Sequence, residues 1–235
     1  MDIPTLRRRA SVACTLIGPA LLLAATATLP WISDADGEET LDIAGSHATA
    51  TNVGDLFLFL GILLTIPAVL LAGRLLRDRA PAPALVGVVA GVAWLVGGML
   101  TVVTNEVSVA VAGSDIPHAD LAGAFDGSGA WVLGVVLAVF LLGWLTAAVA
   151  FGTGVIRSRV APAWAGWALI AAPVVSIAAN LAGVKALDVG GAALALVGFA
   201  ALGRAAAGRG EAAPARTAET TYPRPLGDDR PATRS

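Results

Sequence analysis

The chain has 235 residues, of which 57% are hydrophobic and only 14% are charged, whereas about 25% of the residues of a typical soluble domain carry charge. A formal net charge of −2, with few and scattered basic residues, excludes the basic surface that nucleic-acid binding needs. The single cysteine, Cys14, excludes a disulfide or a cysteine-based metal site within one chain.

Six apolar runs follow one another along the chain. Each is close to the roughly 20 residues that a helix needs to cross a hydrocarbon layer about 30 Å thick. The sequence therefore predicts an all-α fold, a polytopic bundle of six transmembrane helices that occupies residues 1–204. The runs are Ala13–Ile32, Gly54–Leu76, Ala84–Thr104, Gly129–Ile156, Ala161–Leu181 and Ala186–Gly203.

Arginines and acidic residues alternate between the two ends of these runs. Arginines lie at the N-terminus, in loops 77–83 and 157–160, and after the sixth run, whereas acidic residues gather in segments 33–53 and 105–128. Short loops rich in Lys and Arg stay in the cytoplasm. The pattern therefore predicts that both termini are cytoplasmic and that the acid-rich loops face outside.

Two features concern the source and the ends of the chain. Lys185 is the only lysine and Ala and Gly are abundant, which is typical of a GC-rich bacterial genome, so we expect a bacterial plasma membrane.

Residues 205–235 are rich in Ala, Pro, Arg and Thr and have little apolar surface to bury, which predicts a disordered cytoplasmic tail.

The first run has two interpretations. Three arginines before an apolar stretch that contains Ala25–Ala27 (ATA) resemble a cleavable signal peptide. The run continues to Ile32, however, and Trp31 near its end fits an anchor at the membrane interface. We therefore expect a retained span, with cleavage as the alternative.

Two turns of the chain resemble each other. Arg77–Ala82 (RDRAPA) and Arg157–Ala163 (RSRVAPA) each join two apolar runs. They indicate either a duplicated hairpin or the common composition of cytoplasmic turns. Since both hairpins would run from outside to inside and back, a duplication would be a parallel repeat.

The second half of the chain carries a family resemblance. Trp131–Asn180 contains a long apolar span, the turn Arg157–Pro162 and then Trp164–Gly166 (WAG). In this layout the chain resembles a bacterial family of six-span membrane proteins that is classed as a domain of unknown function. The resemblance implies a six-span fold and no catalytic or ligand residues, because none are established for that family.

Polar residues near the predicted outer ends of the spans form a candidate ligand-binding site. Asn105 and Asn180 lie on polar faces of the third and fifth spans, and Asp55 opens the second. The alternative interpretation is that these residues cap helices and bond neighbouring spans. The candidate residues are Asp55, Asn105, Glu106, Asn180 and Lys185.

No catalytic or metal-binding motif stands out. His47 and His118 both fall in the predicted outer loops, and neither an HExxH motif nor a phosphate-binding GxxxxGK[ST] motif occurs. We therefore expect no catalytic residues, no metal and no cofactor.

These observations predict an integral plasma-membrane protein in contact with the lipid bilayer. The favoured function is a non-enzymatic component of a membrane complex that binds a membrane protein partner or a second copy of itself. The alternative is a transporter or binding protein for a small molecule or ion, with an outward-facing polar pocket. Stabilisation against heat by a ligand would favour the alternative.

The predicted topology can be checked with reporter fusions. Fusions after Arg79, Arg159 and Gly210 should report a cytoplasmic location, and fusions after Asp42 and Asp120 an external one, because the arginine-rich loops stay inside. An external reading at Gly210 would contradict an even number of spans.

Overall fold

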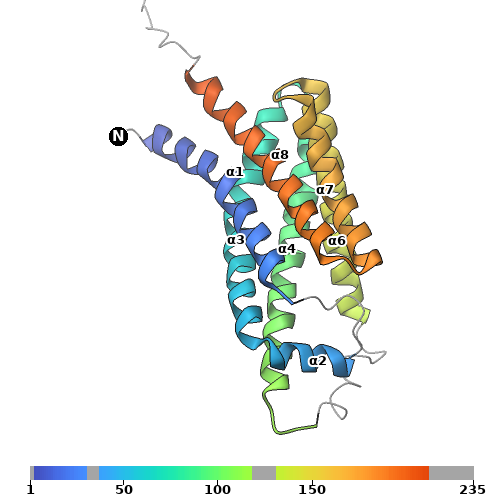
Figure 1. Cartoon of the computed structure of the whole chain (residues 1–235). Coiled ribbons are helices and arrows are strands. Elements are labelled where there is room, and N and C mark those ends of the chain that lie inside the picture. The colour runs from blue at the N-terminus through green and yellow to red at the C-terminus, as the bar shows by residue number, and fades with distance from the viewer. Residues whose placement is uncertain (1–2, 31–36, 118–130, 212–235) are drawn as a thin grey trace, which may run out of the picture.

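A computed structural model describes residues 3–30, 37–117 and 131–211, and everything it describes as regular structure is α-helix. Six of its helices are long and apolar enough to cross a membrane, which confirms the predicted all-α bundle of six spans. One short helix accompanies them (Figure 1). The helices are α1 (Ile3–Thr28), α2 (Gly37–Ser46), α3 (Ala48–Leu76), α4 (Pro81–Ala112), α6 (Trp131–Ser158), α7 (Ala163–Ala182) and α8 (Lys185–Glu211).

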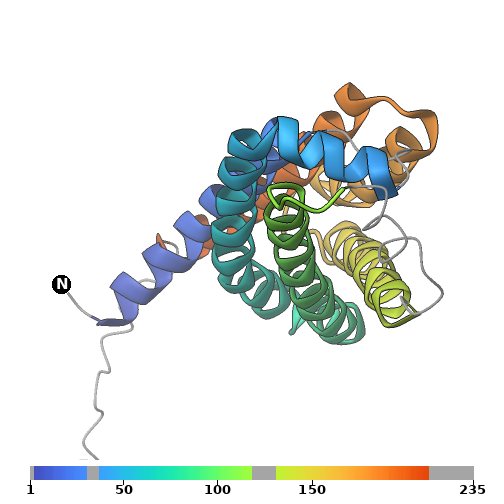
Figure 2. The ribbon, with the colours of Figure 1, turned by 90° about the horizontal axis from the view of Figure 1, so that it is seen from below.

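The six long helices form a closed ring whose order is the chain order. Each packs against the next, from α1 to α3, α4, α6, α7 and α8, and α8 returns to α1. Figure 2 shows this arrangement from one end. The turns α3–α4 and α6–α7 lie together at what we call the arginine end, where the Arg79 guanidinium donates a hydrogen bond of 3.2 Å to the Ser158 carbonyl.

The short helix α2 lies across the opposite end of the bundle, which we call the α2 end (Figures 1 and 2). Leu41 and Ala44 are buried there, and α2 packs against α4 and α3. This contact explains two differences from the expected spans. Helix α3 begins at Ala48 and α4 continues to Ala112, because both extensions have α2 to pack against beyond the apolar runs.

The two terminal helices also differ from the expected boundaries. Helix α1 begins at Ile3 and ends at Thr28, and α8 continues to Glu211 into the segment that was predicted to be disordered. Alanine is the strongest helix former, and Ala206 is buried on the ring, so 205–211 prolong the helix. The rest of the predicted tail lies outside the described residues.

The arginine half of the bundle is closely packed. Phe151, Val69, Val155 and Leu76 are among its fully buried side chains. Gly87 faces the Phe151 ring, so closely that a Cβ at this glycine would lie 2.6 Å from it. The core of the protein therefore lies in this half, and the ring is more open towards the α2 end.

Small-residue motifs pack inside the chain. Gly87 and Gly91 of α4 face Phe151 and Val69, Gly143 of α6 faces the backbone of α4, and Gly191 of α8 faces α7. Such motifs permit close approach of helices within a bundle or between copies. Here they serve contacts within the ring.

Two adjacent glycines in α8 provide a matched test of this packing. A Cβ at Gly191 would lie 2.8 Å from the Ala172 carbonyl oxygen, whereas a Cβ at Gly190 would meet nothing within 4 Å. Gly191→Ala should lower the free energy of unfolding by about 1–3 kcal/mol through overpacking. Gly190→Ala should leave it unchanged or raise it by up to about 1 kcal/mol through helix propensity.

Thermal unfolding of both variants in the same detergent measures the difference. Equal effects of the two substitutions would contradict the close α7–α8 contact.

Candidate functional site

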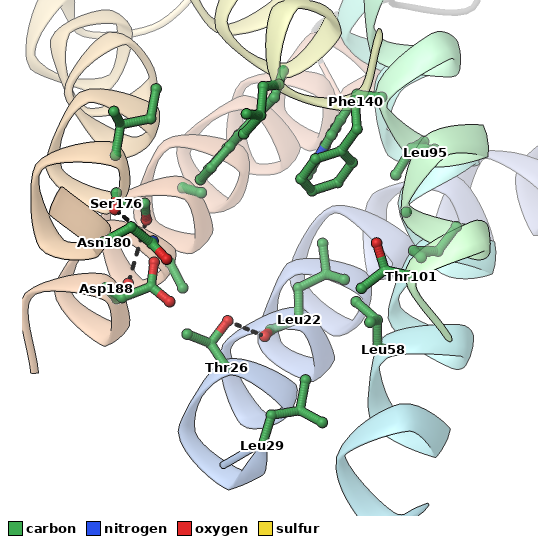
Figure 3. A pocket seen from close by; sticks show the side chains of 18 of the residues that line it. Leu22, Thr26, Leu29, Leu58, Leu95, Thr101, Phe140, Ser176, Asn180 and Asp188 are labelled. Atoms are coloured by element: carbon green, nitrogen blue, oxygen red, sulfur yellow. Dashed lines mark hydrogen bonds between the residues drawn. The ribbon is translucent and has the colours of Figure 1, made fainter. Parts of the chain in front are cut away.

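A cavity of about 630 Å³ lies inside the ring towards the α2 end, and all six long helices contribute to its lining. Most of the lining is aliphatic or aromatic, with a few polar side chains (Figure 3). Ligand pockets in proteins typically enclose about 300–1,000 Å³ with this kind of lining. The cavity is therefore of a size and character that fits a small organic molecule.

Aromatic rings separate the cavity from the packed half of the bundle. The indole rings of Trp94 on α4 and Trp144 on α6 are stacked, with centroids 5.9 Å apart and an angle of 10° between their planes. The Phe140 ring lies against the Trp144 ring, with their centroids 6.5 Å apart. Beyond these rings lies a small void of about 20 Å³, lined in part by Phe151 and Phe199. The tryptophan pair thus forms the floor of the cavity.

A buried carboxyl group lies next to the cavity. Asp55 on α3 is only 1% exposed, and its Oδ1 accepts a hydrogen bond of 2.9 Å from Nδ2 of Asn105 on α4. Its other oxygen, Oδ2, is buried without a hydrogen-bond partner among the described residues. Asn105 itself lines the cavity. The carboxyl group is therefore linked to the cavity through one amide.

Asn180 lines the same cavity from α7, a helix that is not adjacent to α4 in the ring. Its Nδ2 donates a hydrogen bond of 2.8 Å to the Ser176 carbonyl one turn earlier. The Ser176 hydroxyl in turn donates a weak 3.5 Å bond to the Asp188 carbonyl of α8. Ser176, Asn180 and Asp188 thus form a polar patch on the α7–α8 side, visible in Figure 3.

The last two predicted residues have different positions. The Lys185 ammonium donates a 2.5 Å hydrogen bond to the carbonyl of Leu29, the residue that follows α1, and Leu29 lines the cavity. Glu106 is exposed and does not line the cavity. Each residue of a helix is rotated by about 100° from the one before, so Glu106 leaves the face that Asn105 occupies.

The structure therefore brings four of the five predicted residues to one region. Asn105 and Asn180 line the cavity, and Asp55 is hydrogen-bonded to Asn105. Lys185 is hydrogen-bonded to Leu29, a residue at the edge of the cavity that we call its rim. Whether they bind a ligand stays a prediction.

Sequence reasoning missed several lining residues. Asp188 was not among the predicted site residues, yet it lines the cavity. Thr26 was considered only as part of a possible cleavage site, and Trp94 and Trp144 were not singled out. Asp188, as an acid near the start of the sixth predicted span, was a usable signal. The two tryptophans were not, because apolar residues dominate every face of these helices.

Comparison of the chain with protein-family models, with characterised proteins and with solved structures finds no match. The resemblance to the bacterial six-span family therefore stays a prediction. Function has to be argued from the geometry of the cavity and its polar groups.

The two asparagines should respond differently to truncation. Asn105→Ala removes the amide that bonds the buried Asp55, so the free energy of unfolding should fall by about 1–3 kcal/mol. The Asn180 side chain is exposed and bonds only a backbone carbonyl of its own helix. Asn180→Ala should therefore change the free energy of unfolding by no more than about 0.5 kcal/mol. Thermal unfolding in detergent, without added ligand, measures both.

A second substitution identifies the cause. In the Asn105→Ala background, Asp55→Asn should recover part of the lost stability, because a neutral amide is less costly to bury than an unpaired carboxylate. If Asn105→Ala proved as harmless as Asn180→Ala, the Asp55–Asn105 bond would not contribute to stability.

Proposed function

We propose that this chain is a multi-pass membrane protein that binds a small amphiphilic molecule within its helix ring. The observation that carries the proposal is the cavity of about 630 Å³, which all six spans line with apolar residues and a few polar groups. Protein interiors are normally packed with few voids larger than a water molecule. A cavity this large therefore supports a binding role.

The packing of the arginine half favours binding over conduction. A channel or transporter needs a route from one side of the membrane to the other. Here the stacked Trp94 and Trp144 and the buried Phe151 fill the path between the cavity and the arginine end. A site that is reached from one end, or from the bilayer, agrees best with this arrangement.

The location belongs to the same proposal. With the arginine end in the cytoplasm, as the positive-inside rule predicts, the cavity lies in the outer half of the membrane. The arginine-rich, GC-type composition supports a bacterial plasma membrane. The cavity region then corresponds to the outward-facing polar pocket of the alternative function. It includes Asp55, Asn105 and Asn180.

A role as a partner-binding component of a membrane complex stays a prediction. The small-residue motifs that could have joined two copies are used inside the ring, at Gly87, Gly143 and Gly191. They therefore give no support to an interface. The exposed apolar side chains along the spans suit lipid contact equally well.

Filling the cavity should abolish binding. Ala192 of α8 lines the cavity, whereas Ala178 of α7 is exposed on the outside of the bundle. Ala192→Phe should therefore displace any bound molecule, and the matched control Ala178→Phe should not. Mass spectrometry of the intact protein, after extraction from native membranes in mild detergent, measures the bound mass.

The expected result is a co-purifying small molecule on the wild type and on Ala178→Phe that is lost from Ala192→Phe. No bound molecule on any of the three proteins, or equal occupancy on all of them, would overturn the proposed function.

A further inference from the structure

The hydrogen bonds of the two cavity amides determine which of their atoms faces a ligand. Asn105 bonds a carboxyl oxygen and Asn180 bonds a backbone carbonyl oxygen. Both partners accept, so in each asparagine the NH₂ group must point towards the protein. Each NH₂ group keeps a second N–H, and the oxygen of each side-chain amide is turned away from these partners and can accept hydrogen bonds.

Hydroxyl groups along the lining use their protons in the same way. The Thr26 hydroxyl donates to the Leu22 carbonyl at 3.0 Å, and the Thr51 hydroxyl donates to the His47 carbonyl at 3.3 Å. Ser176 donates to the Asp188 carbonyl. A hydroxyl has one proton and two lone pairs, so these three groups can still accept.

Charge in the lining agrees with this polarity. Asp188 brings a carboxyl group to the cavity, and the described lining residues include no lysine or arginine. The nearest ammonium group, that of Lys185, is bonded to the Leu29 carbonyl at the rim. The polar surface that a ligand meets is therefore composed mainly of acceptors.

The apolar part of the cavity reaches the side of the bundle between α6 and α7. These helices approach closely near the arginine end, where Gly152 faces the Gly166 carbonyl. Towards the α2 end, Leu137 of α6 and Leu181 of α7 line the cavity and are also 51% and 86% exposed. Side chains that are both lining and exposed indicate an opening towards the surrounding hydrocarbon.

On the basis of the proposed binding function, we propose that the ligand is an amphiphile with a protonated amine as its head group and an alkyl chain inside the cavity. The ammonium donates to the amide oxygens of Asn105 or Asn180 and to Asp188. The alkyl chain lies over the aromatic floor and leaves between α6 and α7. The same ammonium chemistry occurs in a free long-chain amine and in the ethanolamine head group of a membrane lipid.

Three probes of equal chain length test the head group. They are dodecylamine, dodecanol and dodecanoate, each titrated into the wild-type protein in a neutral maltoside detergent while thermal unfolding is followed. Dodecylamine should stabilise the protein at about tenfold lower concentration than dodecanol, because charge-assisted hydrogen bonds contribute more than neutral ones. Dodecanoate should stabilise the protein least, because its carboxylate can only accept hydrogen bonds and the polar groups of the lining are mainly acceptors.

A charge-matched pair of variants locates the effect. Asp188→Asn should remove most of the preference for dodecylamine over dodecanol. Asp78→Asn, an equal change of charge at an exposed position in the α3–α4 turn, should keep it. If Asp188→Asn proves unstable, the wild-type preference for dodecylamine over dodecanol still tests the ammonium head group by itself.

The outcomes separate this inference from the proposed function. Equal stabilisation by all three probes, with the effect abolished by Ala192→Phe, would overturn the ammonium inference and leave the binding function intact. A preference for dodecanoate would do the same. Stabilisation by no probe, together with no co-purifying molecule, would overturn both.

The source of the ammonium is distinguished in lipid nanodiscs. Phosphatidylethanolamine carries N–H donors, whereas the quaternary ammonium of phosphatidylcholine carries none. If ethanolamine discs raise the dodecylamine concentration needed for stabilisation and choline discs do not, the head group comes from a membrane lipid. If neither competes and dodecylamine keeps its advantage over dodecanol in the discs, the ammonium belongs to a free amine. Equal competition by choline and ethanolamine discs would contradict the ammonium head group.

Discussion

Close approach of helix backbones at glycine is the constraint on which the rest of this structure depends. A Cβ on Gly152 would lie 2.6 Å from the Gly166 carbonyl oxygen, and one on Gly143 would lie 2.9 Å from the backbone nitrogen of Trp94. Apolar helices in lipid gain little from the hydrophobic effect when they associate, so van der Waals packing at small residues has to hold them together. These contacts draw α6 against α4 and α7. The cavity lies towards the α2 end of the same ring, where leucine and aromatic side chains make up much of its lining.

Ring closure depends on a different kind of contact. Helices α1 and α8 are the first and last spans, and their close contacts include Gly203 of α8 against Thr15 of α1. At the other end of the pair, the Lys185 ammonium bonds the Leu29 carbonyl, a backbone group at the end of a helix that lacks an intrahelical donor. A cation at this point also complements the negative end of the α1 dipole. One side chain thus satisfies an orphan carbonyl and holds the cavity rim together across 156 residues of sequence.

The sequence was sufficient to predict the six spans because their signal is compositional and local. It also placed Asp55 and Asn105 at one height, and they are bonded. Element boundaries were less accurate: α4 runs eight residues past the expected Thr104 to Ala112, because α2 supplies a tertiary contact that no local pattern predicts. Glu106 was grouped with Asn105 by height alone, and rotation along the helix separates them. The cavity itself arises from the order in which six helices close a ring, so its tryptophan floor could not be predicted from periodicity.

The buried carboxyl group connects stability with binding. Taking a charged group into the membrane is costly, at about 2.5–3.5 kcal/mol for Asp at the centre of a span. Among the described residues, Asp55 has a partner for only one of its two oxygens. Asn105 is the bridge between this group and the cavity. A donor bound to the Asn105 oxygen would polarise the amide and strengthen its N–H bond to Asp55, since linked hydrogen bonds reinforce one another. By thermodynamic reciprocity, whatever strengthens the Asp55–Asn105 bond also strengthens the binding of that donor. Under the proposed binding function, burial of Asp55 is a cost of folding that a cationic ligand on Asn105 partly offsets through the bond to Oδ1. This gives a physical reason for an acid to lie beside an acceptor-lined cavity.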